Sequence, residues 1–220
     1  MSSDGPKQTL FVQFAAVAKA AAHPHRLALL EQLAQGERSV EVLADRTKLS
    51  IANASQHLQQ MRRAGLLAVR REGKFMFYRL ADDAVLELLA SLRRVAERSS
   101  AEVAQVVRSY FDARDSLEPV SRRELADRLK AGLVTVLDLR PKDEFALGHV
   151  PGAINVPLGE LETRLAEFDP DQEIVAYCRG PYCVLSYEAV AMLRARGFNV
   201  RRLEDGLPEW RVAGMPVAVG

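Results

Sequence analysis

Residues 173–196 decide the fold of the C-terminal half. They read Glu-Ile-Val-Ala-Tyr, then Cys178-Arg179-Gly180-Pro181-Tyr182-Cys183, then Val-Leu-Ser-Tyr-Glu-Ala-Val-Ala-Met-Leu-Arg-Ala-Arg. The first five residues are typical of a buried strand, and the last part has the apolar spacing of an amphipathic helix. The two cysteines of the protein lie in the short turn between them. Because N–H groups of such a turn and of a helix N-terminus stabilise a thiolate or an anionic sulfur adduct, we predict a reactive loop here.

Length and composition bound the possibilities around this loop. A chain of 220 residues has room for two domains of about 110 residues each. Two cysteines are too few for a disulfide framework, and no run of about 18 apolar residues is present. The apolar segment 11–22 is short and lacks the features of a signal peptide. We therefore expect a cytoplasmic protein with no membrane contact and with reactive rather than structural thiols.

The net charge of +1 hides an asymmetry between the two halves. Residues 1–113 carry 16 Lys and Arg against 12 Asp and Glu, whereas residues 114–220 carry 14 against 17. Within residues 36–80 the balance is 9 basic against 4 acidic. A local basic patch of this kind is either a solvated charged face or the footprint of a nucleic acid.

The N-terminal half has the pattern of a winged helix-turn-helix. Helices are expected at 10–22, 26–34, 40–46, 51–64 and from Asp82 or Asp83 to about Phe111, and strands at 66–71 and 75–80. The pair 40–46 and 51–64 would form the motif, with its second helix in the major groove and the strand hairpin as the wing. Polar and basic side chains of that helix and of the wing are the predicted DNA contacts: Ser50, Asn53, Ser55, Gln56, His57, Gln59, Arg62, Arg63, Arg70, Arg71 and Lys74.

Three segments of this half resemble the ArsR-type winged-helix repressors. They are Ala22-His-Pro-His-Arg26-Leu with Leu29-Leu30, then Leu49-Ser50 with Ser55-Gln-His57-Leu58 and Arg63-Ala-Gly65-Leu66-Leu67, then Arg71-Glu-Gly-Lys with Tyr78-Arg79-Leu80. The resemblance covers about residues 10–100. It implies a homodimer, paired through the N-terminal helix and the long fifth helix, on a double-stranded, pseudo-palindromic DNA operator. Many members of that family release DNA when they bind a metal.

The metal ligands of that family are missing from this half. Its Cys-Val-Cys motif would fall on Ser39-Val40-Glu41, and no cysteine precedes Cys178. The long helix contains no histidine, and His23, His25 and His57 are scattered. We therefore predict no metal site and no cofactor.

From Val120 onward, apolar runs at 133–137, 173–177 and 200–203 alternate with helical stretches, which predicts an α/β domain with a mostly parallel sheet. We place the boundary in 113–119, where charges cluster and Pro119 blocks a helix, so that the domains are 1–113 and 114–220. Four motifs of this half resemble the rhodanese domain over about residues 119–219. They are Leu137-Asp138-Leu139-Arg140 with Glu144-Phe145, Gly148-His149-Val150-Pro151-Gly152-Ala153-Ile154-Asn155-Val156-Pro157, the Cys178 loop, and Glu204-Asp205-Gly206 with Trp210 and Gly214-Met-Pro216-Val217.

The rhodanese resemblance implies that Cys178 accepts a sulfane sulfur from a small donor, such as thiosulfate or polysulfide, and carries it as a persulfide. The loop residues Arg179, Gly180, Pro181, Tyr182 and Cys183 would form a cradle of N–H groups for the anionic sulfur, with Arg179 also offering charge. Asp138 and Arg140 are expected to brace the loop or the sheet end.

Two features of the loop refine this expectation. Phosphatases and arsenate reductases need an Arg six residues after the cysteine, where it clamps the oxyanion. Val184 occupies this position, so neither activity is expected. Cys183 either resolves the persulfide of Cys178 or is a small buried residue at the helix start.

Three functional hypotheses remain open from sequence. The first is a transcription regulator, in the repressor family, whose rhodanese domain senses or delivers sulfane sulfur. The second is a sulfurtransferase that uses the winged helix for dimerisation, and the third is a sensor of a soft oxyanion or metalloid held by Cys178 and Cys183.

Overall fold

The computed structural model describes residues 4–113, 115 and 118–220. The chain divides into two compact units, Met1–Glu87 and Leu88–Gly220. Of the linker that we predicted at 113–119, residues 114, 116 and 117 lie outside the described residues. Among the residues described, no helix is both long and apolar enough to cross a membrane.

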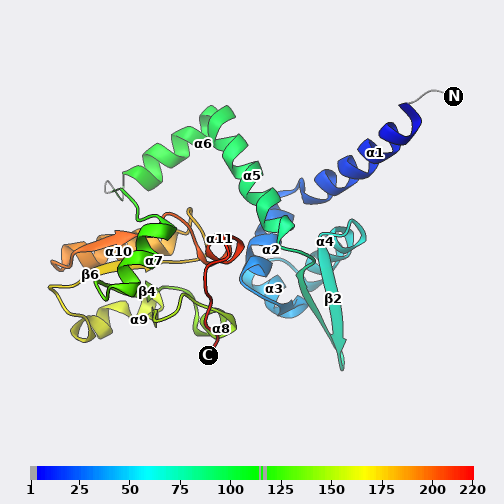
Figure 1. The fold of residues 1–220 in the computed structure, drawn as a ribbon. Helices are drawn as coiled ribbons and strands as arrows, with labels where there is room; N and C mark the ends of the chain where they lie inside the picture. The colour runs from blue at the N-terminus through cyan, green and yellow to red at the C-terminus, as the bar shows by residue number, and fades with distance from the viewer. Residues whose placement is uncertain (1–3, 114, 116–117) are drawn as a thin grey trace. The chain divides into compact units, whose positions relative to one another are not determined.

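The first unit is a winged helix-turn-helix, as predicted. Its elements are α1 (Asp4–Ala21), α2 (Pro24–Ala34), β1 (Arg38–Ser39), α3 (Val40–Thr47), α4 (Ile51–Arg63), β2 (Leu67–Glu72) and β3 (Phe75–Leu80), and the β2–β3 hairpin projects from the helices (Figure 1). Ser39 and Ser50 cap α3 and α4, each by accepting a hydrogen bond from the N–H three residues on. Strand β1, which pairs with β3, was not predicted because two residues carry no periodic pattern.

Leucine side chains from three helices form the core of this unit. Leu29 and Leu30 of α2, Leu43 of α3 and Leu58 of α4 are all fully buried, with 0 % exposure. Because Leu58 and its neighbours Ala54 and Met61 hold one face of α4 against this core, the opposite face of α4 is left at the surface.

The long helix that we predicted to reach Phe111 is wrong in one respect: it is interrupted. Helix α5 (Ala84–Ser99) ends before Ser100, whose extended backbone (φ −106°, ψ 118°) starts the separate helix α6 (Ala101–Val106). The Ser100 hydroxyl accepts the N–H of Val103 at 3.3 Å, so the serine restarts the helix instead of continuing it. The chain then proceeds as a π-helix, η1 (Val107–Asp112).

The second unit is built on a four-stranded parallel sheet, which confirms the predicted fold class. The strand order is β5 (Ile154–Asn155), β4 (Val134–Asp138), β6 (Glu173–Tyr177) and β7 (Val200–Arg202). The helices of this part are α7 (Arg122–Lys130), α8 (Lys142–Leu147), α9 (Leu158–Leu161), η2 (Glu162–Glu167), α10 (Val184–Ala195) and α11 (Leu207–Val212). Strand β5 escaped prediction because it is only two residues long.

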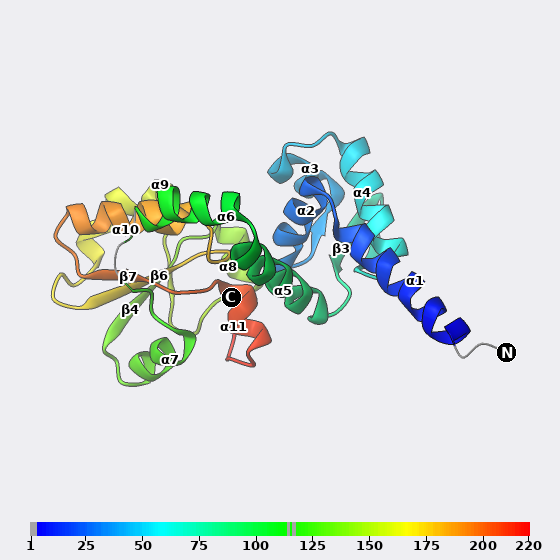
Figure 2. The ribbon, with the colours of Figure 1, turned by 90° about the horizontal axis from the view of Figure 1, so that it is seen from above.

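Helices cover both faces of this sheet (Figure 2). Alternate residues of β6 supply the two cores: Ile174 and Ala176 pack with residues of α10, whereas Val175 and Tyr177 pack with Leu125 of α7 and Trp210 of α11. All four β6 residues are fully buried. This double cover explains why residues 174–177 of β6 are all buried and show no alternation of apolar and charged side chains.

A buried polar network holds the carboxyl edge of the sheet. Asp138, the last residue of β4, receives the guanidinium of Arg140, with Nε···Oδ1 at 3.0 Å, and both side chains have 0 % exposure. Tyr177 at the end of β6 donates its hydroxyl to Asp138 Oδ2 at 2.5 Å and accepts the N–H of Val150 at 3.0 Å. Burial and the charge of Asp138 raise the pKa of Tyr177, so the phenol stays protonated and donates. Arg140 also donates to the carbonyl of Gly148 at 2.7 Å.

We expect Asp138→Asn to lower the free energy of unfolding of this unit by about 3 kcal/mol, because a buried guanidinium then loses its counter-charge. Trp210 is the only tryptophan in the sequence, so urea unfolding followed by its fluorescence reports this unit alone. The matched control is Glu162→Gln, which breaks an exposed pair with Arg196 and should cost less than about 1 kcal/mol. Equal effects of the two changes would contradict a supporting role for the network.

Candidate functional site

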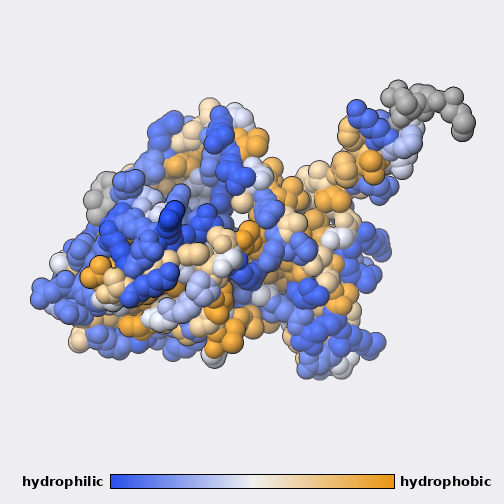
Figure 3. Space-filling model, in the orientation of Figure 1, coloured by the Kyte–Doolittle hydropathy of each residue, from blue (hydrophilic) through white to orange (hydrophobic). Residues whose placement is uncertain are grey.

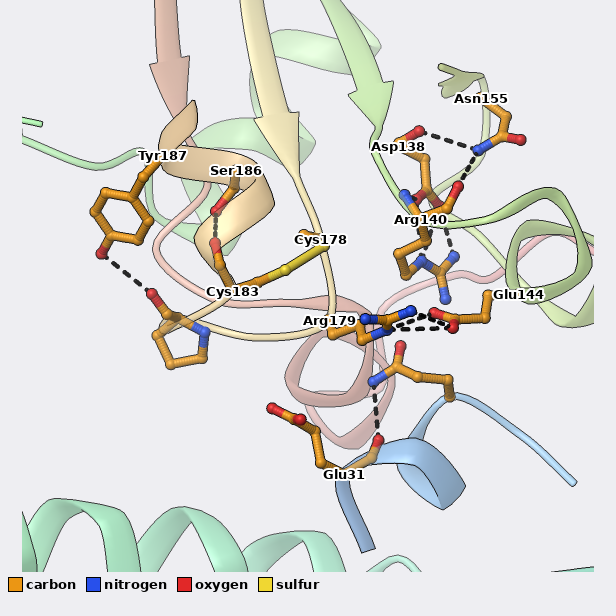
Figure 4. Close-up of a disulfide and its surroundings, with 12 residues drawn as sticks. Glu31, Asp138, Arg140, Glu144, Asn155, Cys178, Arg179, Cys183, Ser186 and Tyr187 are labelled. Carbon is orange, nitrogen blue, oxygen red and sulfur yellow. Dashed lines mark hydrogen bonds and ion pairs between the residues drawn. A yellow bond between two sulfur atoms is a disulfide. The ribbon is translucent and has the colours of Figure 1, made fainter. Parts of the chain in front are cut away.

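The two cysteines close a loop at the carboxyl end of β6. Cys178 directly follows the strand and Cys183 directly precedes α10, and their Sγ atoms are joined as a disulfide, with the two Cα atoms 6.2 Å apart (Figure 4). Cys178 is almost fully buried, at 1 % exposure, whereas Cys183 is half-buried. Whether the two cysteines lie close enough for a disulfide could not be read from the sequence. The backbone brings their Cα atoms within disulfide reach.

The cradle of N–H groups is smaller than we predicted. Pro181 has no N–H, and the N–H of Cys183 donates to the carbonyl of Gly180 at 3.1 Å. Cys183 occupies the N-cap position of α10 but provides no side-chain hydrogen bond there. The first turn of α10 therefore begins beside the loop without a side-chain cap.

The charge of Arg179, which we predicted to attract an anionic sulfur donor, is paired with a carboxylate. Its guanidinium makes a two-pronged ion pair with Glu144, with Nη2···Oε1 at 2.7 Å and Nε···Oε2 at 3.0 Å. Glu144, on α8, has a side chain with 0 % exposure. The pair fixes the first residue after Cys178 to α8, a role for Glu144 that its place in the motif did not reveal (Figure 4).

Gly206 packs against the same stretch of loop from the other side. A Cβ atom at this position would overlap the carbonyl carbon of Arg179 and the backbone nitrogen of Gly180. The backbone of Gly206 is extended (φ −117°), so the glycine is needed here for space rather than for conformation. The Glu-Asp-Gly motif thus has a steric purpose at the reactive loop.

Tyr182 connects the cysteine loop to helix α5 by a hydrogen bond. Its hydroxyl donates to Glu97 Oε1 at 2.7 Å. Burial, together with the hydrogen bond to Glu97 and its negative charge, raises the pKa of Tyr182, so the phenol stays a donor at neutral pH. The Tyr182 ring also packs on Phe111 of η1, with ring centroids 5.0 Å apart.

A second route links the loop to α5 through α11. Arg93, one turn before Glu97, pairs with Glu209 of α11 at 3.1 Å. The other oxygen of Glu209 accepts the N–H of Gly206 at 3.2 Å, and Gly206 is the residue packed on the loop backbone. Helix α5 therefore contacts the loop directly through Tyr182 and indirectly through Glu209 and Gly206 of the α11 region. Neither Arg93 nor Glu97 carries a local sequence signal for these contacts.

The predicted DNA-reading residues of α4 divide by exposure. Asn53, Gln56, Gln59, Arg62 and Arg63 are exposed on the face opposite the core. Ser55 is half-buried and its hydroxyl accepts from Gln59 at 3.3 Å, while the Ser50 hydroxyl is used as the helix cap. Five of the predicted side chains are thus presented together.

The three predicted hairpin residues are all exposed and differ instead in their ion pairs. Arg71 and Lys74 are exposed at its tip, where the surface is hydrophilic (Figure 3). Arg70 instead lies between two carboxylates, Glu37 at 2.6 Å and Glu72, and its guanidinium stacks 4.4 Å above the Phe77 ring. Its charge is therefore engaged within the wing.

His57 differs from the rest of the predicted DNA set. Its ring packs against His23 and His25, with centroids 4.7 and 5.7 Å away. Burial and the charges of His23, Arg26 and His25 lower its pKa, which keeps the imidazole neutral. The three histidines that look scattered in the sequence thus form one cluster.

Comparison with known proteins identifies both units. Residues 21–70 match a helix-turn-helix domain family, and residues 121–213 match the rhodanese-like domain family. The HTH-type transcriptional regulator Rv0324 of Mycobacterium tuberculosis is 45 % identical over 214 residues, covering 97 % of this chain and 94 % of that protein. The chain belongs to this family of HTH-type transcriptional regulators. It combines a winged helix-turn-helix domain with a rhodanese-like domain, as the sequence predicted.

Two further relatives each match one part. A protein named Sulfurtransferase from Allochromatium vinosum is 33 % identical over 85 residues, which are 38 % of this chain and 78 % of that protein. The solution structure of the homodimeric winged helix-turn-helix DNA-binding domain of a possible ArsR-family regulator from Mycobacterium bovis is 38 % identical, with a TM-score of 0.43 over 46 % of this chain and 94 % of that one. The boundary at 113/114 stays a prediction, because the matched families leave residues 71–120 unassigned.

We expect Gly206→Ala to displace the backbone at Arg179 and Gly180 and to lower the rate of sulfur transfer from thiosulfate by at least about tenfold, since small shifts at a reacting centre are costly. The measurement is the steady-state rate of thiosulfate:cyanide turnover. Gly159→Ala is the matched control, because a Cβ there meets nothing within 4 Å. An active Gly206→Ala protein with an unmoved loop would contradict the steric role.

Proposed function

We propose that this regulator senses sulfane sulfur at Cys178 and Cys183 and converts the state of that loop into a change in operator affinity. The observation that carries the proposal is the direct contact of the two-cysteine loop with helix α5 through Tyr182 and Glu97. In the ArsR-type repressors that the N-terminal half resembles, the corresponding helix is part of the dimer interface.

The chemistry needs only the two thiols and the sulfur donor. The Cys178 thiolate attacks the sulfane sulfur of a polysulfide and becomes a persulfide, while the shortened polysulfide leaves with the electron pair of the broken S–S bond. The Cys183 thiolate then attacks Sγ of Cys178, forms the disulfide and releases hydrosulfide. The polysulfide is thus the oxidant, and two thiols become one disulfide. The N–H groups of Gly180, Tyr182 and the first turn of α10 are the donors for the anionic persulfide sulfur.

Closing and opening the disulfide changes the loop at the residue that contacts α5. Tyr182 immediately precedes Cys183, so reduction or persulfidation releases the constraint on its backbone. Its hydrogen bond to a charged acceptor is worth about 1.5–3 kcal/mol, which is the size of a typical coupling free energy between two sites. The pair Arg93–Glu209 adds an indirect connection, because it joins α5 to α11, whose N-cap Gly206 packs on the loop backbone.

The DNA-binding form is proposed to be a homodimer on a double-stranded operator in the cytoplasm. Apolar side chains support this, because α1 exposes Leu10, Phe11, Val12 and Phe14, each more than half accessible, and its surface shows this apolar character (Figure 3). Helix α5 likewise exposes Leu92 and Val95. Such exposed apolar faces are typical of helices that pair with a second subunit. Asn53, Gln56, Gln59, Arg62, Arg63, Arg71 and Lys74 would face DNA.

We expect polysulfide to change the affinity of the full-length protein for its operator by about tenfold, through the coupling described. An operator can be selected from random duplexes with the reduced protein and then used in a gel-shift titration. Cys178→Ser should abolish the response, and Cys183→Ser should stop the reaction at the persulfide. Unchanged operator affinity, with modification of Cys178 verified by mass spectrometry, would rule out sensing.

Tyr182→Phe should reduce the polysulfide-induced change in operator affinity from about tenfold to about twofold or less, because it removes the hydrogen bond to Glu97. Glu97→Gln should act in the same direction, whereas Glu188→Gln, at an exposed position of α10, serves as the control. Sulfur transfer from thiosulfate should persist in all three variants, since none touches the thiols. A full response in Tyr182→Phe would show that the signal takes another route.

A sulfurtransferase is the second candidate function, favoured by the relative of that name. In this case Cys178 passes the sulfane sulfur of thiosulfate to an acceptor and releases sulfite. Rapid thiosulfate:cyanide turnover that is lost in Cys178→Ser, together with sequence-independent DNA binding, would favour transfer over sensing.

A further inference from the structure

A cluster of three histidines lies in the winged-helix unit, distant in the sequence from the cysteine loop. His23 is the N-cap residue of α2, His25 lies in the first turn of α2, and His57 lies in the middle of α4. One ring nitrogen of each can be chosen so that all three lie within 4.8 Å of one another. We predicted no metal site in this half because the histidines are distant in sequence, and the helix packing brings them together.

His57 has an unsatisfied ring nitrogen that favours a ligand, and His25 is free to reorient towards it. The Nδ1 atom of His57 is buried and has no hydrogen-bond partner within the part of the chain that the structure describes. A buried polar atom left unsatisfied is costly, so a site that keeps one gains stability when a ligand fills it. His25 is exposed, so its ring can turn towards the other two without disturbing the core.

The donor set selects the class of ion. Three imidazoles with no carboxylate suit a borderline divalent ion such as Zn²⁺, Co²⁺ or Ni²⁺ rather than Mg²⁺ or Ca²⁺. Tetrahedral Zn–N bonds of about 2.0–2.1 Å need ligand nitrogens roughly 3.3 Å apart, so the rings must close by about 1.5 Å. His23 Nδ1 already accepts the backbone N–H of His25 at 3.1 Å. Binding through Nδ1 displaces that hydrogen bond, and binding through Nε2 moves the ring proton to Nδ1, which also breaks it.

We propose that His23, His25 and His57 form a binding site for a divalent ion of the zinc class, with three imidazole ligands and a fourth position for water. The bound ion joins the start of α2 to α4, the helix that carries the exposed Asn53, Gln56 and Gln59. The site is separate from the cysteine chemistry, because its three ligands all belong to the first unit.

The test uses Co²⁺ as a visible probe on the untagged full-length protein. The proposal expects one Co²⁺ per chain, with the absorption bands of a tetrahedral ion, and displacement of the bands by Zn²⁺. His25→Gln and His23→Asn should each weaken binding by at least about tenfold. His25 is exposed, and Asn keeps a capping acceptor at position 23, so both variants should fold.

Controls separate this site from other ligands of the chain. His149→Asn removes the remaining histidine of the sequence, and Cys178→Ser/Cys183→Ser removes both thiols; neither should change Co²⁺ binding. Zinc should also increase the hydrogen-exchange protection of residues 51–63 in the wild type and not in His25→Gln. Absence of Co²⁺ binding, binding retained in both histidine variants, or binding lost with the cysteines would each overturn the proposal.

Discussion

The absence of a side chain at Gly206 fixes the position of the cysteine loop. The backbone of Arg179 and Gly180 lies so close that any Cβ would overlap it, and the loop is thereby packed onto the start of α11. From that point Glu209 reaches Arg93 of α5 at 3.1 Å. A change at Cys178 therefore occurs where the loop backbone is closely packed, so small displacements of the loop are transmitted to α11 and its ion pair with α5.

Helices and strands with a clear periodicity of apolar residues were predictable from the sequence. Contacts between side chains that are distant in the sequence were not. The buried run of β6, the capped helices at Ser39 and Ser50 and the hairpin turn all follow from local patterns. The pairing of Arg179 with Glu144 and of Tyr182 with Glu97 joins residues far apart in the sequence, with no local signal.

A helix break at Ser100 and the ion pairs of Arg70 are two further features of the structure that local sequence patterns did not reveal. A serine in an apolar period looks like a tolerated helix residue, yet Ser100 ends one helix and caps the next, because its hydroxyl competes for backbone N–H groups. A basic residue on the wing looks like a phosphate contact, yet Arg70 is paired with two carboxylates. Counting charges along the sequence cannot separate it from Lys74, which is exposed at the hairpin tip.

We propose that the bond between Cys178 and Cys183 controls DNA binding. This proposal is tested most directly by measuring the operator affinity of one preparation with both thiols reduced and again with the disulfide formed, each state verified by mass spectrometry. We expect affinities that differ by about tenfold and return on re-reduction, in keeping with a coupling free energy of about 1.4 kcal/mol. Equal affinities in the two states would contradict it.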